Sequence, residues 1–352
     1  MKKKSKRSRR LALVAACGLM ATGGTAALTA AGAQAAAPGA ATPGATAAHA
    51  AAPNATAAAS GQTGPYLYLG WGSPPKATDV MAATGTTQFT MAFILSDGGC
   101  NPKWDGSRAL TGGSDQSTIN SIRAAGGDVT VSFGGWSGAK LGEKCSSASA
   151  LAGAYQKVID AYRLKSIDID IEASEFENAT VRQRVIDALK IVKQKNSGIK
   201  VYVTFGTTTS GPDANGKDLV RRGAASGVDV DGWTVMPFDF GQGSLDMAAA
   251  TKSAVDGLKN TVASAYGLSS DAAYRKSGFS SMNGRTDVAG ETVTLDNFKS
   301  VVSYAKSHHL ARVSFWSLNR DRACGSGTDA DACSGINQGT YDFTKVLAGY
   351  TG

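Results

Sequence analysis

Eight stretches rich in β-branched and aromatic residues alternate with helical patterns, and this alternation constrains the fold more than any other feature. The alternation continues from Pro65 to about residue 350. The expected strands are Tyr66–Trp71, Gln88–Leu95, Asp128–Gly134, Ser166–Glu172, Lys200–Phe205, Gly232–Phe240, Ser277–Met282 and Arg312–Leu318.

The clearest helical pattern covers residues 179–195, where Val181, Val185, Leu189 and Val192 recur at three- and four-residue spacing. Eight strand–helix units favour a single α/β domain, a closed (β/α)8 TIM barrel. An open doubly wound sheet would alternate in the same way, but no G-x-G-x-x-G or phosphate loop follows an early strand. Less periodic helices are expected at 147–163, 245–266, 295–309 and 341–350.

The expected fourth strand has a strict alternation of isoleucines and acids. Because successive side chains point to opposite faces, the isoleucines would face the helices and the acids would face the barrel axis. Burial and mutual repulsion make such a stack of carboxyl groups costly, so stability alone would not select it. The acids are Asp168, Asp170 and Glu172.

These acids stand at the carboxyl end of their strand, where barrel enzymes place their active sites. Glu172, the nearest to the rim, is the candidate proton donor. The alternative is an acidic strand held in salt bridges or binding calcium, which the isoleucine alternation disfavours.

The two ends of the chain differ from this domain. Residues 1–35 have a basic start, an Ala-rich apolar run and an Ala-Gln-Ala site, which is typical of a signal peptide and predicts a secreted, extracellular protein. A membrane anchor is the alternative for this run. Residues 36–62, rich in Ala, Pro and Thr, predict a linker, and residues 63–352 form the expected barrel domain.

The formal charge of +8 comes almost entirely from the first ten residues. Without residues 1–35 the chain has 29 Lys and Arg against 28 Asp and Glu, a net charge of +1. We therefore expect no nucleic-acid partner. We also expect no membrane partner after cleavage, and a monomer by default.

Four cysteines remain beyond residue 35, an even number suited to an oxidising compartment. Four cysteines allow three pairings. Proximity favours Cys100 with Cys145, which follow neighbouring strands, and Cys324 with Cys333, which flank one loop. A zinc site is the alternative, but there is no C-x-x-C and no nearby histidine, so we expect neither a metal nor a cofactor.

The D-x-D-x-E run, preceded by Ser132-Phe133-Gly134-Gly135, resembles glycoside hydrolase family 18. Segments 92–94, 98–104 (GGCNPKW), 236–240 (MPFDF) and 314–321 (SFWSLNRD) resemble a bacterial and archaeal chitinase branch of that family, in the expected order along residues 65–350.

The resemblance implies a chitinase that cleaves β-1,4 bonds between N-acetylglucosamine units with retention. Glu172 would protonate the glycosidic oxygen while the substrate's own acetamido oxygen attacks, an exception to the two-carboxylate rule. Asp170 would hold the acetamido N–H, Asp168 would share a proton with Asp170, and Asp239 would add a polar contact.

The same resemblance places Trp316 as an apolar floor under the sugar, with a core tryptophan as the alternative. Gly134 and Gly135 would permit close approach of backbone and substrate, or would simply form a turn. Trp71, Trp104, Trp136 and Trp233 have core packing as the default and stacking on sugars as the alternative, for which Trp136, just past the glycine pair, is the first candidate. The remaining expected substrate-binding residues are Met236, Phe238, Phe240 and Tyr68.

Two departures from the family pattern stand out. Lys165-Ser166 replaces the usual D-G ahead of the acids, and Phe238 and Phe240 stand where a tyrosine hydroxyl usually contacts the acetamido carbonyl. Unless Tyr68 or a water replaces that hydroxyl, its loss costs about 2.7 to 4 kcal/mol of transition-state stabilisation, so a slow enzyme is expected.

Two other functions remain open: an endo-β-N-acetylglucosaminidase acting on N-glycans, and a non-catalytic, lectin-like barrel. A Ser-His-Asp triad is disfavoured because the histidines, His49, His308 and His309, lie far from any strand rim.

Overall fold

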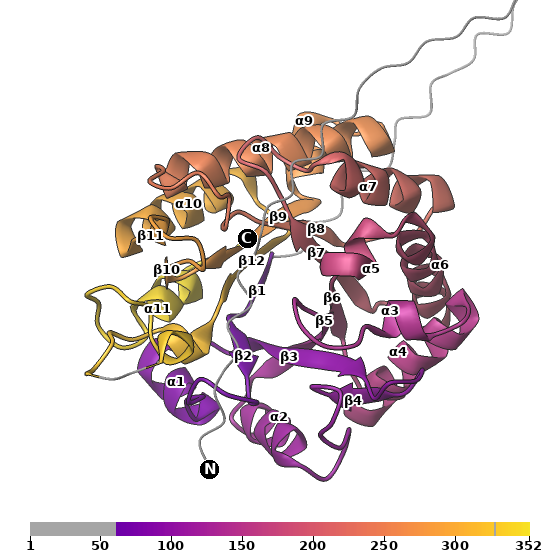
Figure 1. Cartoon of the computed structure of the whole chain (residues 1–352), viewed down its shortest axis with the longest axis horizontal. Helices are drawn as coiled ribbons and strands as arrows, with labels where there is room; N and C mark the ends of the chain where they lie inside the picture. Colours follow the sequence, from indigo (N-terminus) through magenta and orange to yellow (C-terminus); the bar gives the residue numbers. More distant parts are fainter. Residues whose placement is uncertain (1–60, 327–328) are drawn as a thin grey trace, which may run out of the picture. The chain divides into compact units, whose positions relative to one another are not determined.

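The computed structural model describes residues 61–326 and 329–352. The expected signal peptide and nearly all of the expected linker lie outside the described residues and stay predictions. In the described part, strands curl into a central ring and helices surround it (Figure 1).

The ring is built from parallel strands. Its first barrel strand is split in two: the first half pairs with the last strand and the second half pairs with the next strand in sequence, which closes the ring. The order around the ring is β1 (Gln62–Thr63), β12 (Arg312–Trp316), β9 (Ser277–Met282), β8 (Gly232–Met236), β7 (Lys200–Gly206), β6 (Ser166–Asp170), β5 (Asp128–Gly134), β3 (Gln88–Ser96) and β2 (Tyr66–Tyr68). Because β1 and β2 share one strand position, the fold is the predicted (β/α)8 barrel.

Helices follow the strands around the outside of the ring (Figure 1). They are α1 (Ala77–Thr84), α2 (Ser114–Ala124), α3 (Leu141–Lys144), α4 (Ala148–Tyr162), α5 (Ala173–Glu177), α6 (Ala179–Lys195), α7 (Ala214–Ser226), α8 (Met247–Tyr266), α9 (Ser270–Tyr274), α10 (Leu295–His308) and α11 (Asp342–Ala348). The loops contain smaller elements. Strand β4 (Pro102–Trp104) pairs antiparallel with β3, and β10 (Gly284–Arg285) pairs antiparallel with β11 (Thr292–Val293). Two short 3₁₀ helices are η1 (Leu318–Arg320) and η2 (Ala330–Ala332).

Every predicted strand is present, but four of them end earlier than predicted, because the chain leaves the hydrogen-bonded ladder where the rim loops begin. The acid strand β6 ends at Asp170, although Ile171 N still donates to Thr204 O at 2.8 Å. Glu172 remains extended, with φ −136° and ψ 170°. The side-chain alternation therefore continues through Glu172. The other three early ends are Tyr68, Met236 and Trp316.

The isoleucines of the acid strand are buried in the main hydrophobic core together with the apolar face of α6. Ile167, Ile169 and Ile171 are at most 1% exposed. This confirms the predicted direction of the strand: isoleucines toward the helices and acids toward the axis.

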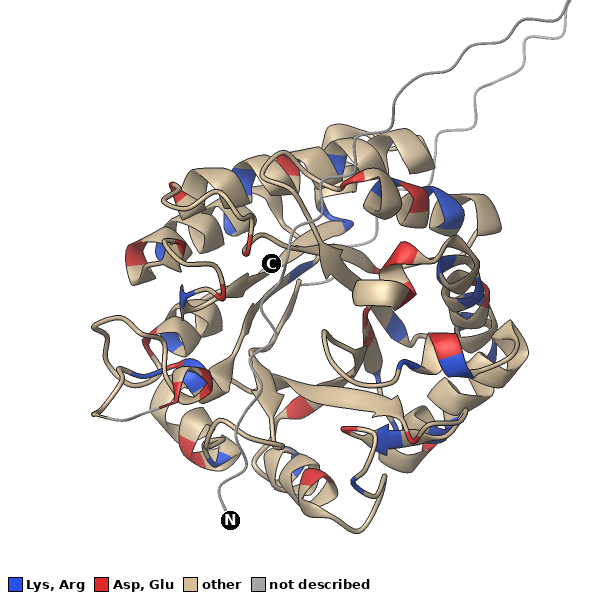
Figure 2. Cartoon of the chain, viewed as in Figure 1, with Lys and Arg blue, Asp and Glu red and all other residues tan. Residues whose placement is uncertain are grey.

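Acidic and basic residues are interspersed along the outer helices rather than segregated (Figure 2). Within the ranges that the structure describes, no helix has the length and apolar character that a membrane span requires.

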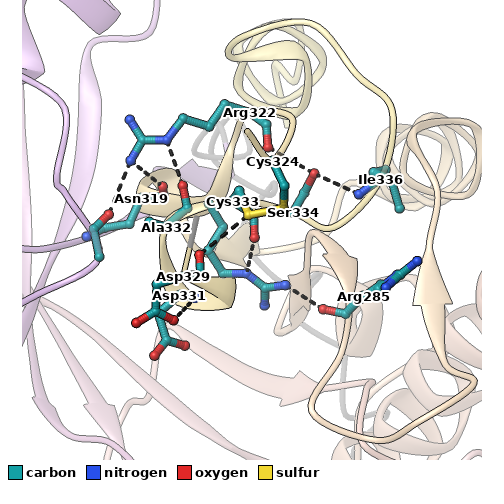
Figure 3. The surroundings of a disulfide bond; sticks show 12 residues. Arg285, Asn319, Arg322, Cys324, Asp329, Asp331, Ala332, Cys333, Ser334 and Ile336 are labelled. Carbon is teal, nitrogen blue, oxygen red and sulfur yellow. Dashed lines mark hydrogen bonds between the residues drawn. A yellow bond between two sulfur atoms is a disulfide. The ribbon is translucent and has the colours of Figure 1, made fainter. Parts of the chain in front are cut away.

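Both predicted disulfides are present. Cys100, after β3, is bonded to Cys145 at the end of α3, and Cys324 is bonded to Cys333 across one loop (Figure 3). The alternative of a zinc site at these cysteines is therefore wrong.

Candidate active site

Asp168 lies at the centre of a polar network on the barrel axis. Its Oδ2 accepts hydrogen bonds of 2.7 Å from the Tyr66 hydroxyl of β2 and the Ser132 hydroxyl of β5. Its Oδ1 accepts one of 2.7 Å from the Thr204 hydroxyl of β7 and forms an ion pair with Arg312 of β12. Because these donors come from four strands around the ring, the carboxylate can only face the interior. The alternative interpretation expected the acids in salt bridges. Asp168 does form one, with Arg312, but it lies inside the barrel.

Asp170 lies two residues nearer the rim and is also buried. Burial raises the pKa of Asp170 well above its ordinary value, and the negative charges of Glu172 and Asp168 raise it further. The positive charges of Lys140 and Arg312 oppose this rise. Among the described residues, Asp170 Oδ1 has no hydrogen-bond partner despite its burial.

Glu172 is the outermost of the three acids and is only partly buried. It is the extended residue just before α5, and Ala173, which follows it, has a positive φ of 51°. The strand therefore presents a buried carboxyl group with a raised pKa beside a carboxyl group that is partly exposed. Such a pair is suited to general acid–base chemistry.

A buried lysine and a further glutamate flank the acids. Lys140 Nζ donates to the carbonyl oxygens of Gly135 and Ser137, at 2.8 Å to Ser137, and thereby fixes the loop after β5. Glu175 of α5 accepts a hydrogen bond of 3.0 Å from Gly142 N. Burial raises the pKa of Glu175 to about 7, although the charge of Lys140 opposes the rise.

An aromatic cluster surrounds Tyr66, whose hydroxyl binds Asp168. The Trp316 ring stacks on Phe93 with a centroid distance of 5.5 Å and meets the edges of Tyr66 and Trp71 at 5.9 and 6.0 Å. Tyr68 lies 6.0 Å from Trp316. Burial raises the pKa of Tyr68, and the neighbouring Asp105 raises it further, although Arg108 opposes the rise.

The tryptophans divide into two groups. Trp104 and Trp233 are fully buried, as expected of core residues. Trp71 and Trp136 are 44% and 52% exposed, the largest exposed apolar side chains in the described part of the chain. Trp71 therefore departs from the core default, and Trp136 has the exposure that a stacking platform requires.

Gly134 and Gly135 are needed by the fold itself. A Cβ at Gly134 would lie 2.2 Å from the Asp170 carbonyl oxygen, and one at Gly135 would lie 2.8 Å from the Phe93 ring. Both have positive φ, 107° and 83°. The missing side chains thus let the acid strand and the aromatic cluster approach the end of β5.

The segment after β8 carries the other expected binding residues. Asp239 has a positive φ of 55°, and its Oδ1 accepts from Asp287 N at 3.0 Å and Val288 N at 3.2 Å. Glu291 accepts from Phe240 N and Gly241 N. Asp239 therefore anchors a rim loop in this structure. Met236 is buried, and Phe238 and Phe240 pack partly buried against the core.

The residues after Trp316 organise the rim. Asn319 Nδ2 donates to the carbonyl oxygens of Tyr68 and Trp71, at 2.8 Å each. Asp321 accepts from Phe343 N and Thr344 N at the start of α11. Arg322 binds carbonyl oxygens around the second disulfide (Figure 3).

Four residues of this site were not singled out from the sequence: Tyr66, Lys140, Glu175 and Arg312. Strand alternation contained the signal for two of them, since Arg312 shares a strand face with Trp316, and Tyr66 shares one with Tyr68. Lys140 and Glu175 lie in a loop and a short helix, where no periodicity shows which way they point.

In the comparisons with known proteins, no family model matches the chain. A curated relative, the probable bifunctional chitinase/lysozyme of Escherichia coli (strain K12), is 26% identical over 305 residues, which cover 82% of this chain and 34% of that protein. Endochitinase 11 of Metarhizium anisopliae is 27% identical over 271 residues, 73% of this chain and 52% of that protein. The chain thus spans about a third to a half of the length of these two relatives.

Two solved structures that are similar to this chain are also chitinases. Active domain 2 of a thermostable chitinase from Pyrococcus furiosus, solved as catalytic site mutants complexed with chito-oligosaccharides, has a TM-score of 0.74 and 26% identity, covering 85% of this chain and 97% of that one. A family GH18 chitinase from Chromobacterium violaceum shares the fold at 17% identity, with a TM-score of 0.56 and 82% of each chain covered. In its barrel fold the chain is thus similar to a solved family GH18 chitinase, and in sequence it is similar to curated chitinases.

Proposed function

We propose that this chain is a secreted chitinase that hydrolyses β-1,4 bonds between N-acetylglucosamine units with retention of configuration. The observation that carries the proposal is the buried, unpartnered Oδ1 of Asp170 beside Glu172 on one strand face. A buried acceptor oxygen without a donor is rare in proteins, because burial removes its water. An acetamido N–H of a bound sugar would supply the missing donor. The chito-oligosaccharides bound by the related Pyrococcus furiosus domain support the same substrate class.

In the first step, Glu172 donates its proton to the glycosidic oxygen as the bond from that oxygen to the anomeric carbon breaks. The acetamido carbonyl oxygen of the same sugar forms a new bond to that carbon. Asp170, as a carboxylate, accepts the acetamido N–H and offsets the positive charge that develops on the ring.

In the second step, Glu172, now a carboxylate, takes a proton from a water whose oxygen attacks the anomeric carbon. The bond to the acetamido oxygen breaks, and its electron pair returns to the amide. Two displacements restore the original configuration, and Glu172 is again protonated.

The aromatic side chains supply the binding surface in this proposal. Trp316 lies 6.0 Å from the exposed Trp71, and Trp136 is exposed on the loop after β5. Sugar C–H faces pack well on indole rings, so we assign these tryptophans to sugar binding.

Secretion is supported by the composition of residues 1–35 and by the two disulfides, which persist in oxidising compartments. The expected monomer stays a prediction.

The test is hydrolysis of N-acetylglucosamine tetramers to hexamers beside matched glucosamine oligomers that lack the acetyl group. We expect cleavage of the acetylated series alone, because the attacking oxygen belongs to the acetyl group. Equal cleavage of both series would exclude substrate assistance.

Two further outcomes would identify the alternatives. Release of N-glycans from a glycopeptide without cleavage of the oligomers would indicate an endo-β-N-acetylglucosaminidase. Binding of the oligomers without any hydrolysis would indicate a lectin-like barrel. The replacement of the family's tyrosine by Phe238 and Phe240 would then be the first explanation to test for the missing activity.

A further inference from the structure

Trp71 carries an exposed ring on a backbone segment that other parts of the chain hold. It follows β2 and is 44% exposed, and its ring centroid lies 4.6 Å from that of Tyr68 and 6.0 Å from that of Trp316. Its carbonyl oxygen accepts a hydrogen bond of 2.8 Å from Asn319 Nδ2. A ring that is fixed before a ligand arrives binds more tightly than a mobile one, because binding then costs less conformational entropy.

Arg322 binds the backbone that follows the exposed indole. Its Nη2 donates to the carbonyl oxygens of the next two residues, Gly72 at 3.2 Å and Ser73 at 2.7 Å. The same nitrogen donates to Asn319 O at 3.0 Å, and Nε donates to Ala332 O at 2.7 Å (Figure 3). Because all four acceptors are backbone carbonyl oxygens, these bonds fix the path of the backbone beside the indole.

Residues 329–334 support this arginine from the other side. Cys333 is buried and is bonded to Cys324, which stands two residues after Arg322 (Figure 3). Ser334, also buried, donates to Arg322 O from its N at 3.0 Å and from its hydroxyl at 3.1 Å. The disulfide and these hydrogen bonds therefore anchor both the backbone and the side chain of Arg322 to one segment.

The anchored segment also packs closely against the backbone beside the indole. A Cβ at Gly72, whose φ is 74°, would lie 2.6 Å from Asp331 O and 3.2 Å from Asn319 Nδ2. A side chain at residue 72 would thus push the two segments apart. The position of the Trp71 backbone therefore depends on the segment that Arg322 and the disulfide fix.

We propose that Arg322, supported by the Cys324–Cys333 disulfide, is a positioning residue that fixes Trp71 in the orientation that binds a sugar, and that it thereby favours longer oligomers. The inference deepens the proposed function and rests on it for the identity of the ligand.

The preference for longer oligomers follows from where the ring lies. Tyr66 binds Asp168 and contacts Trp316, and Trp316 in turn contacts Trp71. Trp71 is thus linked to the acid strand through two further rings, so we place the sugar that it binds away from the bond that is cleaved. An oligomer that is too short to reach this ring gains nothing from its fixed orientation.

The first test needs no substrate and uses fluorine NMR of the full chain labelled with 5-fluorotryptophan. The chain has five tryptophans, and Trp71→Phe assigns the resonance of residue 71. In Arg322→Met we expect this resonance to move toward its position in the urea-unfolded chain, because the freed indole samples several orientations. The resonances of the buried Trp104 and Trp233 should stay in place. An unchanged Trp71 resonance overturns the proposal.

Arg123→Met is the matched control. Arg123 is half-buried like Arg322 and also donates to a backbone carbonyl oxygen, that of Tyr162. It pairs with Asp128, the first residue of β5, at the opposite end of the barrel from the rim. We expect this variant to leave the Trp71 resonance in place. If it moves the resonance as Arg322→Met does, the movement reports a general loosening and the proposal fails.

A second variant covers the case in which Arg322→Met does not fold. The double variant Cys324→Ser/Cys333→Ser releases the segment that supports Arg322 and keeps the guanidinium itself. We expect the Trp71 resonance to move in the same direction. An unchanged resonance in this double variant would then overturn the proposal.

The second test is a double-variant cycle on the hydrolysis of N-acetylglucosamine hexamers. Arg322→Met should raise KM about 2- to 12-fold, the range for the loss of one aromatic contact, and should leave kcat nearly unchanged. The shortest oligomer that the chain cleaves should be affected less. Because Arg322 acts through Trp71, Arg322→Met should have no further effect in a Trp71→Ala background. Equal effects in the two backgrounds, or a fall of kcat alone, would overturn the proposal.

The inference and the proposed function fail separately. If the chain cleaves no oligomer, the proposed function fails, and the fluorine spectra still decide whether Arg322 fixes Trp71. If hexamers are cleaved and the Trp71 resonance does not respond to Arg322→Met, the inference alone fails.

Discussion

Glu175 is a buried acid three residues beyond Glu172 whose pKa, about 7, lies above that of an exposed glutamate. The folded state therefore binds its proton more tightly than the unfolded state does. The resulting stabilisation is complete below pH ~4.5 and is lost as the pH rises through about 7. Glu175→Gln keeps the acceptor for Gly142 N and abolishes this titration.

We expect the free energy of unfolding of Glu175→Gln, relative to wild type, to increase by up to about 3 kcal/mol between pH 4.5 and pH 8. Urea unfolding at several pH values measures it, with Glu177→Gln as the control, since Glu177 lies exposed on the same helix. A difference that stays constant with pH would show that Glu175 does not titrate in this range.

At the residue scale, strand alternation was the reliable guide. It placed Asp168, Asp170 and Glu172 on the axis, because a buried β-strand allows only two faces. Strand alternation does not show which side chains meet across the barrel. The ion pair of Arg312 with Asp168 joins residues 144 apart in sequence, so only the structure reveals it. Asp239 shows the same limit: its carboxylate binds backbone N–H groups of a rim loop, a contact that no sequence period encodes.

At the scale of elements, the two disulfides close loops of different length, 45 and 9 residues. In the chain-entropy model the longer loop contributes about 4 kcal/mol and the shorter one about 2.5 kcal/mol. We therefore expect Cys100→Ser/Cys145→Ser to lower the free energy of unfolding more than Cys324→Ser/Cys333→Ser does. Denaturant unfolding of the two double variants measures the order, and a larger loss for the shorter loop would contradict it.

The strands and helices were predictable as elements because hydrophobic periodicity reports burial on one face. The helix predicted at 179–195 is α6, with the same bounds. The strand ends were less accurate where a strand runs into a rim loop, as at Met236, since apolar residues such as Phe238 continue beyond the last ladder hydrogen bond. Small additions such as β10 and β11 have no periodic signal at all.

At the scale of the whole molecule, one amide side chain reinforces the closure that the pairing of β1 with β12 provides. Asn319 is fully buried, donates to the carbonyl oxygens of Tyr68 and Trp71, and accepts from Tyr68 N at 3.2 Å. It thus ties the end of the first barrel strand to the segment after the last. Asn319→Ala leaves the two buried backbone groups of Tyr68 unsatisfied, at about 1 to 3 kcal/mol for each group.

We expect Asn319→Ala to lower the free energy of unfolding by roughly 2 to 5 kcal/mol and to speed amide hydrogen exchange at residues 66–71 before the rest of the barrel. Asn178→Ala, which removes a cap of α6 on the outside, is the control and should leave exchange at 66–71 unchanged. Uniform acceleration of exchange around the ring would show that Asn319 does not act at the closure.

The central claim is that Glu172 is the proton donor of a retaining hydrolysis. The most direct measurement follows the anomeric form of the first products from N-acetylglucosamine hexamers by proton NMR, for wild type, Glu172→Gln and the control Glu177→Gln. The account predicts β-anomeric products from wild type and Glu177→Gln, and a rate lower by roughly 10² to 10⁴ in Glu172→Gln, which still folds and binds. Products that are initially α-anomeric, or a Glu172→Gln variant as fast as wild type, would contradict it.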